Sequence, residues 1–303
     1  MTVIEVNGLT KRYGDHLAVD DVSFTVDRGE IFGILGPNGA GKTTTVECIE
    51  GLRRPDAGTI EVLGLDPLTD VRPLRERVGI QLQKSHLQEQ LKVREALELY
   101  ASFYRNPRDP RELLDEWGLA DKQDARFGKL SGGQQQRLFI ALALIGRPEV
   151  AFLDELTTGL DPRARRATWS LIQQIRDSGV TVVLVSHFMD EVEELCDRVA
   201  IFEQGRIVAL DSPAGLVDQV DPEHSMRFRP VGDFDPALLE ALPNVVRVEQ
   251  RRDRVVVTGR GDFATEVTAT LARHQVVVAD LRIAPRTLDD AYVALTGRTF
   301  DTA

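Results

Sequence analysis

The stretch GPNGAGKT, from Gly36 to Thr43, constrains the fold of this chain more than any other feature of the sequence. It follows an apolar run rich in β-branched residues and precedes TTTVECIEGL, a helical pattern that we expect to end near Gly51. Because glycine has no Cβ, such a loop can point successive backbone N–H groups at a phosphate. The strand–loop–helix context favours a phosphate-binding loop over a chance cluster of glycines.

Four side chains are expected to complete this site. Lys42 would reach the β and γ phosphates of a nucleotide, and the Thr43 hydroxyl would hold Mg²⁺. In the run VAFLDEL an apolar strand ends at Asp154, which can enter the Mg²⁺ shell. Glu155 follows it and is free to polarise an attacking water as a general base. The alternative is an exposed acidic strand end, which the phosphate loop in the same chain disfavours.

A second glycine-containing motif, LSGGQQQR, begins at Leu130. Ser131 and Gln134 have the spacing of a capping box, so a helix is predicted to start there. Gly132 and Gly133 leave its first turn bare, and an anion could approach the N–H groups of that turn. With N–H donors but no lysine, the motif could complete a phosphate site and would make a poor one alone. The alternative is a well-capped helix and nothing more.

The arrangement of apolar runs predicts an α/β fold. VIEVNGLTKRYG and VSFTVDRGEIFGILG are interpreted as strands, the second ending at the phosphate loop. Helical spacing over residues 93–104 and 111–117 predicts a helical insertion at about 87–130. VAFLD, TVVLVSH and RVAIFEQGRIVAL then alternate with helical patterns, which indicates βαβ units and a mostly parallel sheet.

The pattern changes near residue 220, and we expect a second domain there. Residues 1–220 would form the nucleotide-binding domain and 221–303 a small α+β accessory domain of order βαββαβ, closed by the helical run TLDDAYVALTG. Arg251, Arg252 and Arg254 fall in its hairpin and are interpreted as a solvated turn rather than a binding site.

Composition limits the functional classes. The 303 residues include 37 basic and 48 acidic side chains, a net charge of −11 that argues against broad nucleic-acid binding. Apolar runs fall short of the about 18 residues of a membrane span, and no secretion signal is visible. We therefore expect a cytoplasmic protein that acts at a membrane only through a partner. Cys48 and Cys196 lack metal-ligand spacing and are expected to be buried thiols.

Taken together, the motifs resemble those of the ATP-binding cassette (ABC) ATPases over roughly the first two-thirds of the chain. The resemblance implies a P-loop NTPase core with a mixed, largely parallel sheet and antiparallel N-terminal strands. The run GLDP, which begins at Gly159, resembles the D-loop of this family. The run VSH, which ends at His187, resembles the family's switch histidine. Gln83 in GIQLQ resembles the glutamine that senses Mg²⁺ and water, and Tyr13 the aromatic that stacks on adenine. Leu156 departs from the family, which usually has proline there; we expect altered local stiffness without loss of hydrolysis.

The resemblance implies a site residue by residue, with ATP and Mg²⁺ as cofactors. The implied catalytic residues are Glu155, His187 and Gln83, and the implied Mg²⁺ ligands are Thr43, Gln83 and Asp154. The implied nucleotide-binding residues are Tyr13, Gly36, Pro37, Asn38, Gly39, Ala40, Gly41, Lys42, Thr43, Thr44, Ser131, Gly132, Gly133, Gln134 and Asp161.

The resemblance also implies partners. Two cassettes of this family face each other head to tail, so Ser131 and the amides after it would meet the γ-phosphate held by Lys42 of a second copy. The helical insertion would contact a separate membrane permease, placing the chain on the cytoplasmic face of the membrane. No nucleic-acid partner is expected.

The C-terminal run TLDDAYVALTGR resembles the tails of drug- and antibiotic-exporter ATPases of the daunorubicin-resistance type. It implies export of a drug, antibiotic or other small hydrophobic compound, with the tail supporting or regulating dimerisation. The transported molecule itself is not encoded here, because the permease selects it. Two alternatives stay open: a soluble cassette ATPase acting on ribosomes or DNA, and a degenerate cassette serving as a nucleotide-gated scaffold.

Overall fold

The computed structural model describes residues 1–81, 86–220, 223–232, 234–284 and 287–298, and it divides the chain into two compact units. The first unit spans Met1–Pro213 and the second begins at Ala214. Helix α8 (Pro213–Val220) starts at this division. The sequence analysis predicted the boundary at residue 220, which is the end of this helix. Each unit is described by itself below.

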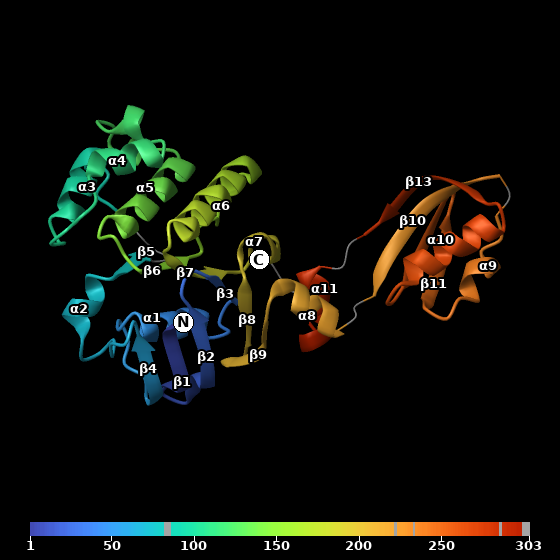
Figure 1. Cartoon of the computed structure of the whole chain (residues 1–303), viewed down its shortest axis with the longest axis horizontal. Helices are drawn as coiled ribbons and strands as arrows, with labels where there is room; N and C mark the ends of the chain where they lie inside the picture. Colours follow the sequence, from blue (N-terminus) through green and yellow to red (C-terminus); the bar gives the residue numbers. More distant parts are fainter. Residues whose placement is uncertain (82–85, 221–222, 233, 285–286, 299–303) are drawn as a thin grey trace. The chain divides into compact units, whose positions relative to one another are not determined.

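A six-stranded sheet forms the centre of the first unit (Figure 1). Its order is β5 (Val78–Gln81), β6 (Val150–Asp154), β7 (Thr181–Ser186), β3 (Ile31–Leu35), β8 (Arg198–Glu203) and β9 (Arg206–Asp211). All neighbours are parallel except β8 and β9, which are antiparallel. Strands β3, β6 and β7 are buried along their whole length, as expected of parallel strands covered on both faces. The predicted mixed, largely parallel sheet is confirmed.

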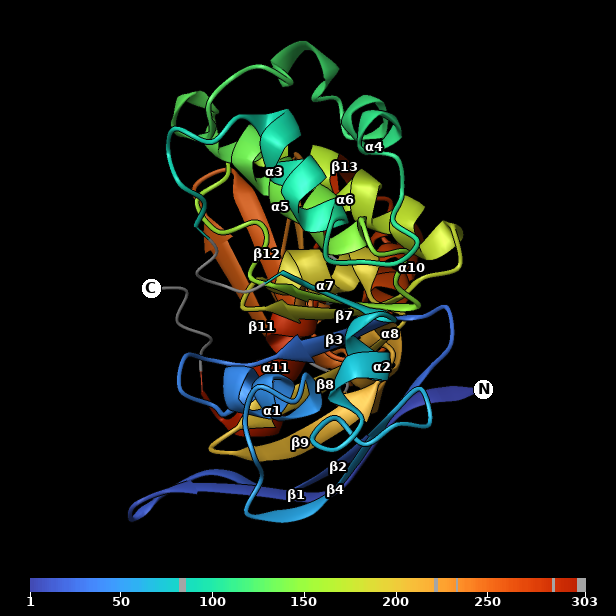
Figure 2. The same cartoon turned by 90° about the vertical axis from the view of Figure 1, so that its left-hand side faces the viewer.

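An antiparallel three-stranded sheet, ordered β2 (His16–Asp27), β1 (Thr2–Tyr13) and β4 (Ala57–Val62), packs against the central sheet (Figure 2). The prediction that VSFTVDRGEIFGILG is one strand is wrong. A turn at Gly29, with φ 79°, divides it into β2 of the antiparallel sheet and β3 of the central sheet. Phe24 and Phe32 on either side of this turn stack at 5.2 Å in the core that the two sheets share.

Helices complete the first unit. Beside the central sheet lie α1 (Lys42–Ile49), α2 (Val71–Arg75), α5 (Gly132–Leu144), α6 (Pro162–Asp177) and α7 (Met189–Leu195). The segment between β5 and α5 carries α3 (Val93–Ala101), α4 (Pro110–Glu116) and the 3₁₀ turns Ala120–Lys122 and Phe127–Lys129. The predicted helical insertion is confirmed, although its first helix ends at Ala101 and not at residue 104. Figure 2 shows α3 and α4 beside α5.

One arginine ties this insertion to α5. The Arg137 guanidinium donates to the carbonyl oxygens of Trp117 at 3.2 Å and Gly118 at 3.4 Å, just where α4 ends. Trp117 is itself buried, so the end of α4 is fixed by both packing and hydrogen bonds. The start of α5 therefore moves with the insertion.

The second unit contains an antiparallel sheet ordered β11 (Val245–Arg251), β12 (Arg254–Gly259), β10 (His224–Val231) and β13 (Val277–Ile283). Helices α9 (Ala237–Glu240) and α10 (Phe263–Arg273) cover one face of it (Figure 1). The core between helices and sheet is formed by Met226, Phe228, Leu239, Val255, Val257, Phe263, Val267 and Leu271. The chain order βαββαβ is confirmed, and α11 (Leu288–Thr296) follows it.

Two further expectations were tested. Cys48 and Cys196 are buried and unpaired by disulfides, as predicted. Among the helices that the structure describes, none combines the length and the apolar character needed to cross a bilayer.

The approach of β5 to α5 gives a test of this packing. Gly79 of β5 leaves no room for a Cβ, which would collide with the backbone carbonyl oxygen of Ala143. We expect Gly79→Ala to destabilise the first unit by about 1–3 kcal/mol through overpacking. For a unit of this size, the thermal midpoint falls by about 2–4 °C for each kcal/mol.

Gly132→Ala is the matched control for this measurement, because a Cβ there meets nothing nearer than 4.0 Å. Its midpoint is expected to equal or exceed that of the unchanged chain, since alanine favours helix over glycine. Equal midpoints for all three proteins would show that β5 and α5 do not pack as described.

Candidate nucleotide-binding site

The predicted phosphate loop lies between the end of β3 and the start of α1. A Cβ at Gly36 would collide with the carbonyl oxygen of Phe202, and one at Gly41 with that of Ala18. Gly41 also has φ 98°, a left-handed conformation that glycine adopts without strain. These close approaches hold the loop against β8 and β2, so the surrounding backbone requires glycine at positions 36 and 41.

Lys42 is the first residue of α1 and is only 4% exposed. Its Nζ donates to the carbonyl oxygens of Gly36 at 2.6 Å and Pro37 at 3.0 Å, across the loop. Burial lowers the pKa of this ammonium, and the nearby carboxylates of Glu155 and Asp154 oppose that shift. The ammonium group of Lys42 is thus held inside the phosphate loop.

Asp154 ends β6 and is 6% exposed. Burial, with a smaller contribution from Glu155, raises the pKa of its carboxyl to about 6, while Lys42 acts in the opposite direction. Within the part of the chain that the structure describes, its Oδ1 is buried without a hydrogen-bond partner. A carboxylate oxygen left open beside a phosphate loop suits a hard cation such as Mg²⁺.

Glu155 continues from β6 in an unusual backbone conformation, with φ 48° in a residue other than glycine. Such conformations cost about 1–3 kcal/mol and occur often at functional sites. Its backbone N–H donates to the carbonyl of Val185 at 2.9 Å, which fixes the turn against β7. The turn brings Glu155 to the same pocket as Lys42 and Thr43.

His187 follows β7 and lies beside Glu155. Its Nδ1 is 3.3 Å from Glu155 Oε1, which is close enough for an ion pair when the imidazole is protonated. The same nitrogen does not meet the angular criteria of a hydrogen bond, so the pair is a close polar contact rather than an aligned bond. The structure therefore brings Glu155 and His187, both predicted site residues, close together.

A buried carboxylate that the sequence analysis missed supports His187. Glu191 of α7 is fully buried; it accepts a hydrogen bond from Ser186 Oγ at 2.6 Å and another from Trp169 Nε1 at 3.0 Å. Ser186 Oγ in turn accepts from the Phe188 backbone N–H at 3.0 Å, so residues on both sides of the histidine are fixed. Burial raises the pKa of Glu191.

The sequence pattern of the run DEVEEL is typical of an exposed acidic helix, and the sequence analysis missed Glu191 for this reason. Glu191 lies four residues before the buried Leu195, on the same helix face, and that spacing could have identified it.

A pocket of about 320 Å³ opens above the phosphate loop. Its walls contain predicted site residues together with His16 and Ala18, which the sequence analysis did not identify. The predicted residues that line it are Tyr13, Asn38, Gly39, Gly41, Lys42, Thr43, Thr44 and Glu155. The Tyr13 ring is partly exposed and is flanked by the Arg53 guanidinium at 5.2 Å and Lys11 Nζ at 5.8 Å. An aromatic face with two cations beside it suits a base attached to phosphates.

The remaining loop residues support the backbone. Ala40 is buried, and its carbonyl oxygen accepts from the Gly205 N–H at 3.0 Å. Leu156, at the position where proline was expected, is buried. Gln83, predicted as a catalytic residue and Mg²⁺ ligand, lies outside the described residues.

The second motif forms a separate feature at the start of α5. Ser131 is its N-cap: Ser131 Oγ accepts from the Gln134 N–H at 3.4 Å, and Gln134 Oε1 accepts from the Ser131 N–H at 2.9 Å. The predicted capping box is confirmed. Ser131 and Gly132 are exposed, and neither they nor Gly133 and Gln134 line the pocket above the phosphate loop.

Packing among the described residues does not explain the bare first turn of α5. A Cβ at Gly132 would meet nothing nearer than 4.0 Å, and one at Gly133 would make an ordinary contact of 3.6 Å with Ala164. Asp161, also predicted to bind nucleotide, caps α6 by accepting from the N–H groups of Arg163 and Ala164, both at 2.9 Å.

Comparison with known proteins identifies the chain's relatives. Residues 19–158 match the ABC transporter family. A daunorubicin resistance ATP-binding protein of Streptomyces coeruleorubidus is 37% identical over 98% of this chain and 96% of its own length. A Nod factor export ATP-binding protein of Rhizobium etli is also 37% identical, over 99% of this chain and 95% of that protein.

Solved structures agree with this assignment. An ATP-binding subunit of an ABC transporter matches 72% of this chain and 92% of its own with a TM-score of 0.65 and 29% identity. A dimeric ATP-binding cassette in a post-hydrolysis state, bound to ADP and phosphate, matches 69% of this chain and 98% of its own with a TM-score of 0.63 and 26% identity. The phosphate loop, the paired carboxylates and the near-complete overlap with these relatives lead to one conclusion: the chain belongs to the ATP-binding, ATP-hydrolysing subunits of ABC transporters of the exporter type.

Proposed function

We propose that two copies of this chain enclose ATP and Mg²⁺ at a shared interface and drive a separate permease that exports a drug-like or antibiotic-like compound. The observation that carries the proposal is the exposed, glycine-flanked start of α5, which has phosphate-binding groups but lies outside the chain's own nucleotide pocket. The N–H groups at this helix start could bind a phosphate if a second copy of the chain supplied the nucleotide.

Within one subunit, the phosphate loop would hold the nucleotide. The amides at the start of α1 would face the phosphates, with Lys42 moving from the loop carbonyls to the β and γ phosphates. Tyr13 would stack on adenine at the mouth of the pocket. Each of these groups already lies in the wall of the pocket, so binding requires side-chain adjustment rather than rearrangement of the fold.

Mg²⁺ would be held by the Thr43 hydroxyl and the open oxygen of Asp154, with Gln83 as the third predicted ligand. When bound, the ion supplies positive charge that offsets charge on the phosphates. Because Asp154 is buried, a cation would stabilise its charged form and restore part of the hydration energy that burial removes.

Hydrolysis would be assigned to Glu155 and His187. Glu155 would accept a proton from the attacking water, since its carboxylate lines the pocket beside Lys42. His187, 3.3 Å from Glu155, would contact the γ-phosphate and keep the carboxylate oriented. Glu191 would act as a positioning residue for His187 through Ser186.

The shared interface would link nucleotide state to shape. ATP binds better to the closed pair, because only then do Ser131, Gly132 and Gly133 of one copy reach the γ-phosphate in the other. Hydrolysis removes that differential affinity and lets the pair separate. Since Arg137 ties α5 to the helical insertion, closure would also move the insertion, the proposed contact surface of the permease. The chain would thus be peripheral to the cytoplasmic face of the membrane.

The proposed class of cargo comes from the relatives. Two similar proteins that span nearly the whole chain are named for daunorubicin resistance and for Nod factor export. The second name states export and the first states resistance to a drug, which together favour transport over work on ribosomes or DNA. The net charge of −11 agrees with this preference.

Glu155→Gln tests the assignment of the general base. Glutamine keeps the shape of glutamate but cannot accept the proton, so we expect ATP turnover to fall by about 100-fold or more while ATP binding is retained. With ATP and Mg²⁺ the variant should accumulate as a dimer, measured by size-exclusion chromatography beside a phosphate-release assay. Turnover close to that of the unchanged protein would remove Glu155 from the mechanism.

Gly132→Asp tests the role of the start of α5. A carboxylate at a helix N-terminus stabilises the helix but repels a phosphate, so stability and activity should change in opposite directions. We expect an unchanged or higher thermal midpoint, ATP binding within about twofold of normal, and turnover reduced by about 100-fold or more. Gly132→Ala, which adds no charge, is the control and should retain more turnover. Normal hydrolysis by the aspartate variant would show that no phosphate approaches this terminus.

A further inference from the structure

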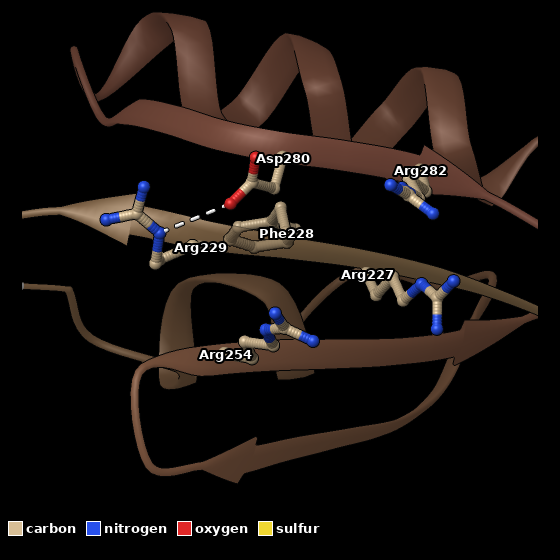
Figure 3. Close-up of a pocket in the computed structure, with 6 residues that line it drawn as sticks. All are labelled: Arg227, Phe228, Arg229, Arg254, Asp280 and Arg282. Atoms are coloured by element: carbon tan, nitrogen blue, oxygen red, sulfur yellow. Dashed lines mark hydrogen bonds and ion pairs between the residues drawn. The ribbon is translucent and has the colours of Figure 1, made fainter.

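The sheet of the second unit has one face covered by α9 and α10 and an opposite face that carries charged side chains. Met226, Phe228, Val255 and Val257 point toward the helices, so the residues that alternate with them on β10 and β12 point away. Arg227, Arg229 and Arg254 are among these outward residues. Figure 3 shows them together with Arg282 of β13.

Some arginines on this face have acidic partners. Arg229 pairs with Asp280 at 3.4 Å, and Arg247 and Arg251 both pair with Glu249 at 2.7 Å. Arg227, Arg254 and Arg282 differ: across the described ranges of the chain, no carboxylate forms an ion pair with any of them. The sheet therefore places acids beside one set of arginines and leaves the other set uncompensated.

The strand register makes this arrangement unfavourable without a ligand. Arg227 lies directly opposite Arg282 in the antiparallel pair β10–β13, and its neighbour on the other side, in β12, is Val256. Like charges that face each other across a ladder are destabilising. The opposed guanidinium groups create positive charge on a protein whose net charge is −11.

These arginines also surround a hollow. A pocket of about 350 Å³ is lined by Arg227, Phe228, Arg229, Arg254, Asp280 and Arg282, and the sticks in Figure 3 show the guanidinium groups gathered around it. Four arginines and one aspartate give the lining a formal charge of +3. The volume is at the lower end of the range of small-ligand sites, about 300–1,000 Å³.

We propose that this arginine pocket, formed by Arg227, Arg254 and Arg282, binds a phosphate-bearing ligand. A phosphate carries a charge of about −1.5 to −2 at neutral pH, so one or two phosphate groups match the three uncompensated guanidinium groups. The planar guanidinium fork also fits phosphate oxygens two at a time.

An acidic polypeptide fits the pocket less well. Two of the three arginines lie on β10 and β12, the central strands of the sheet, whereas an added peptide strand would bind at the edge strands β11 or β13. The ligand could be a free phosphorylated metabolite or the headgroup of a phospholipid, because both present the same group. Arg254, which the sequence analysis placed in a solvated turn, belongs to this site under the proposal.

Pyrophosphate binding to the full-length chain is the primary test. All proteins compared carry Lys42→Ala, so that the phosphate loop of the first unit contributes little to the titration. In this background, Arg227→Gln with Arg282→Gln should weaken pyrophosphate binding by at least about tenfold, measured by calorimetry. The matched control is Arg247→Gln with Arg251→Gln, which removes the same charge from paired arginines on the same face and should change affinity by less than about twofold.

Folding is followed in the same samples. Because Arg227 and Arg282 repel each other, the double variant should keep or raise the thermal midpoint, and pyrophosphate should raise the midpoint only in proteins that retain both arginines. Should the double variant fail to fold, Arg282→Gln alone on the edge strand β13 replaces it.

Sedimentation with vesicles separates the two sources of phosphate. Vesicles of phosphatidylcholine with phosphatidic acid are compared with phosphatidylcholine alone. If pyrophosphate binds and the Arg227/Arg282 variant loses this binding, the pocket is supported and the source is a free phosphorylated metabolite. If only the phosphatidic acid vesicles bind and the variant loses this binding, the pocket is supported and the source is a phospholipid headgroup. The proposal is overturned if neither probe binds, if both double variants lose binding equally, or if a polyglutamate peptide binds at these arginines when neither phosphate probe does.

Discussion

The close approach of the phosphate loop to the surrounding backbone is the constraint on which the site depends. Carbonyl oxygens of Phe202 and Ala18 occupy the space that side chains at Gly36 and Gly41 would need. The loop is thus fixed where β3 ends, and the parallel strands β6 and β7 end at the same edge of the sheet. Asp154 and His187 follow from that arrangement, since each is set by the end of its strand. A ligand crevice at the carboxyl ends of parallel strands is the general property of such sheets.

Burial then determines the electrostatics. The pKa of Lys42 is lowered and that of Asp154 is raised to about 6, so both groups are shifted toward their neutral forms although they carry opposite charges. Mutual attraction offsets the loss of hydration only in part. Under the proposed function, a nucleotide with Mg²⁺ would supply the missing charges of both signs. The site is therefore preorganised for a ligand that is itself strongly charged, and the strained backbone of Glu155 fits the same interpretation.

Sequence reasoning succeeded where a local pattern determines the structure. The phosphate loop, the capping box at Ser131 and the βαββαβ order depend on neighbouring residues and were correctly predicted. It failed where tertiary packing decides. The opposition of Arg227 and Arg282 depends on the register of strands about 50 residues apart, which no pattern within either strand specifies. Sequence reasoning also overlooked one local signal: the polar residues Asp27 and Arg28 and the turn-forming Gly29 interrupt the run Val22–Leu35 at the point where the chain changes sheets.

The central claim is that the start of α5 in one copy completes the phosphate site of another, and mixing two inactive variants tests it most directly. Lys42→Ala disables the phosphate loop, and Gly132→Asp disables the start of α5. In a mixed pair, one of the two sites combines an intact loop with an intact helix start. If the sites are shared, an equal mixture should regain up to about a quarter of normal ATP turnover, because half of the pairs are mixed and each has one intact site. Turnover that stays at the average of the two separate variants would contradict the account.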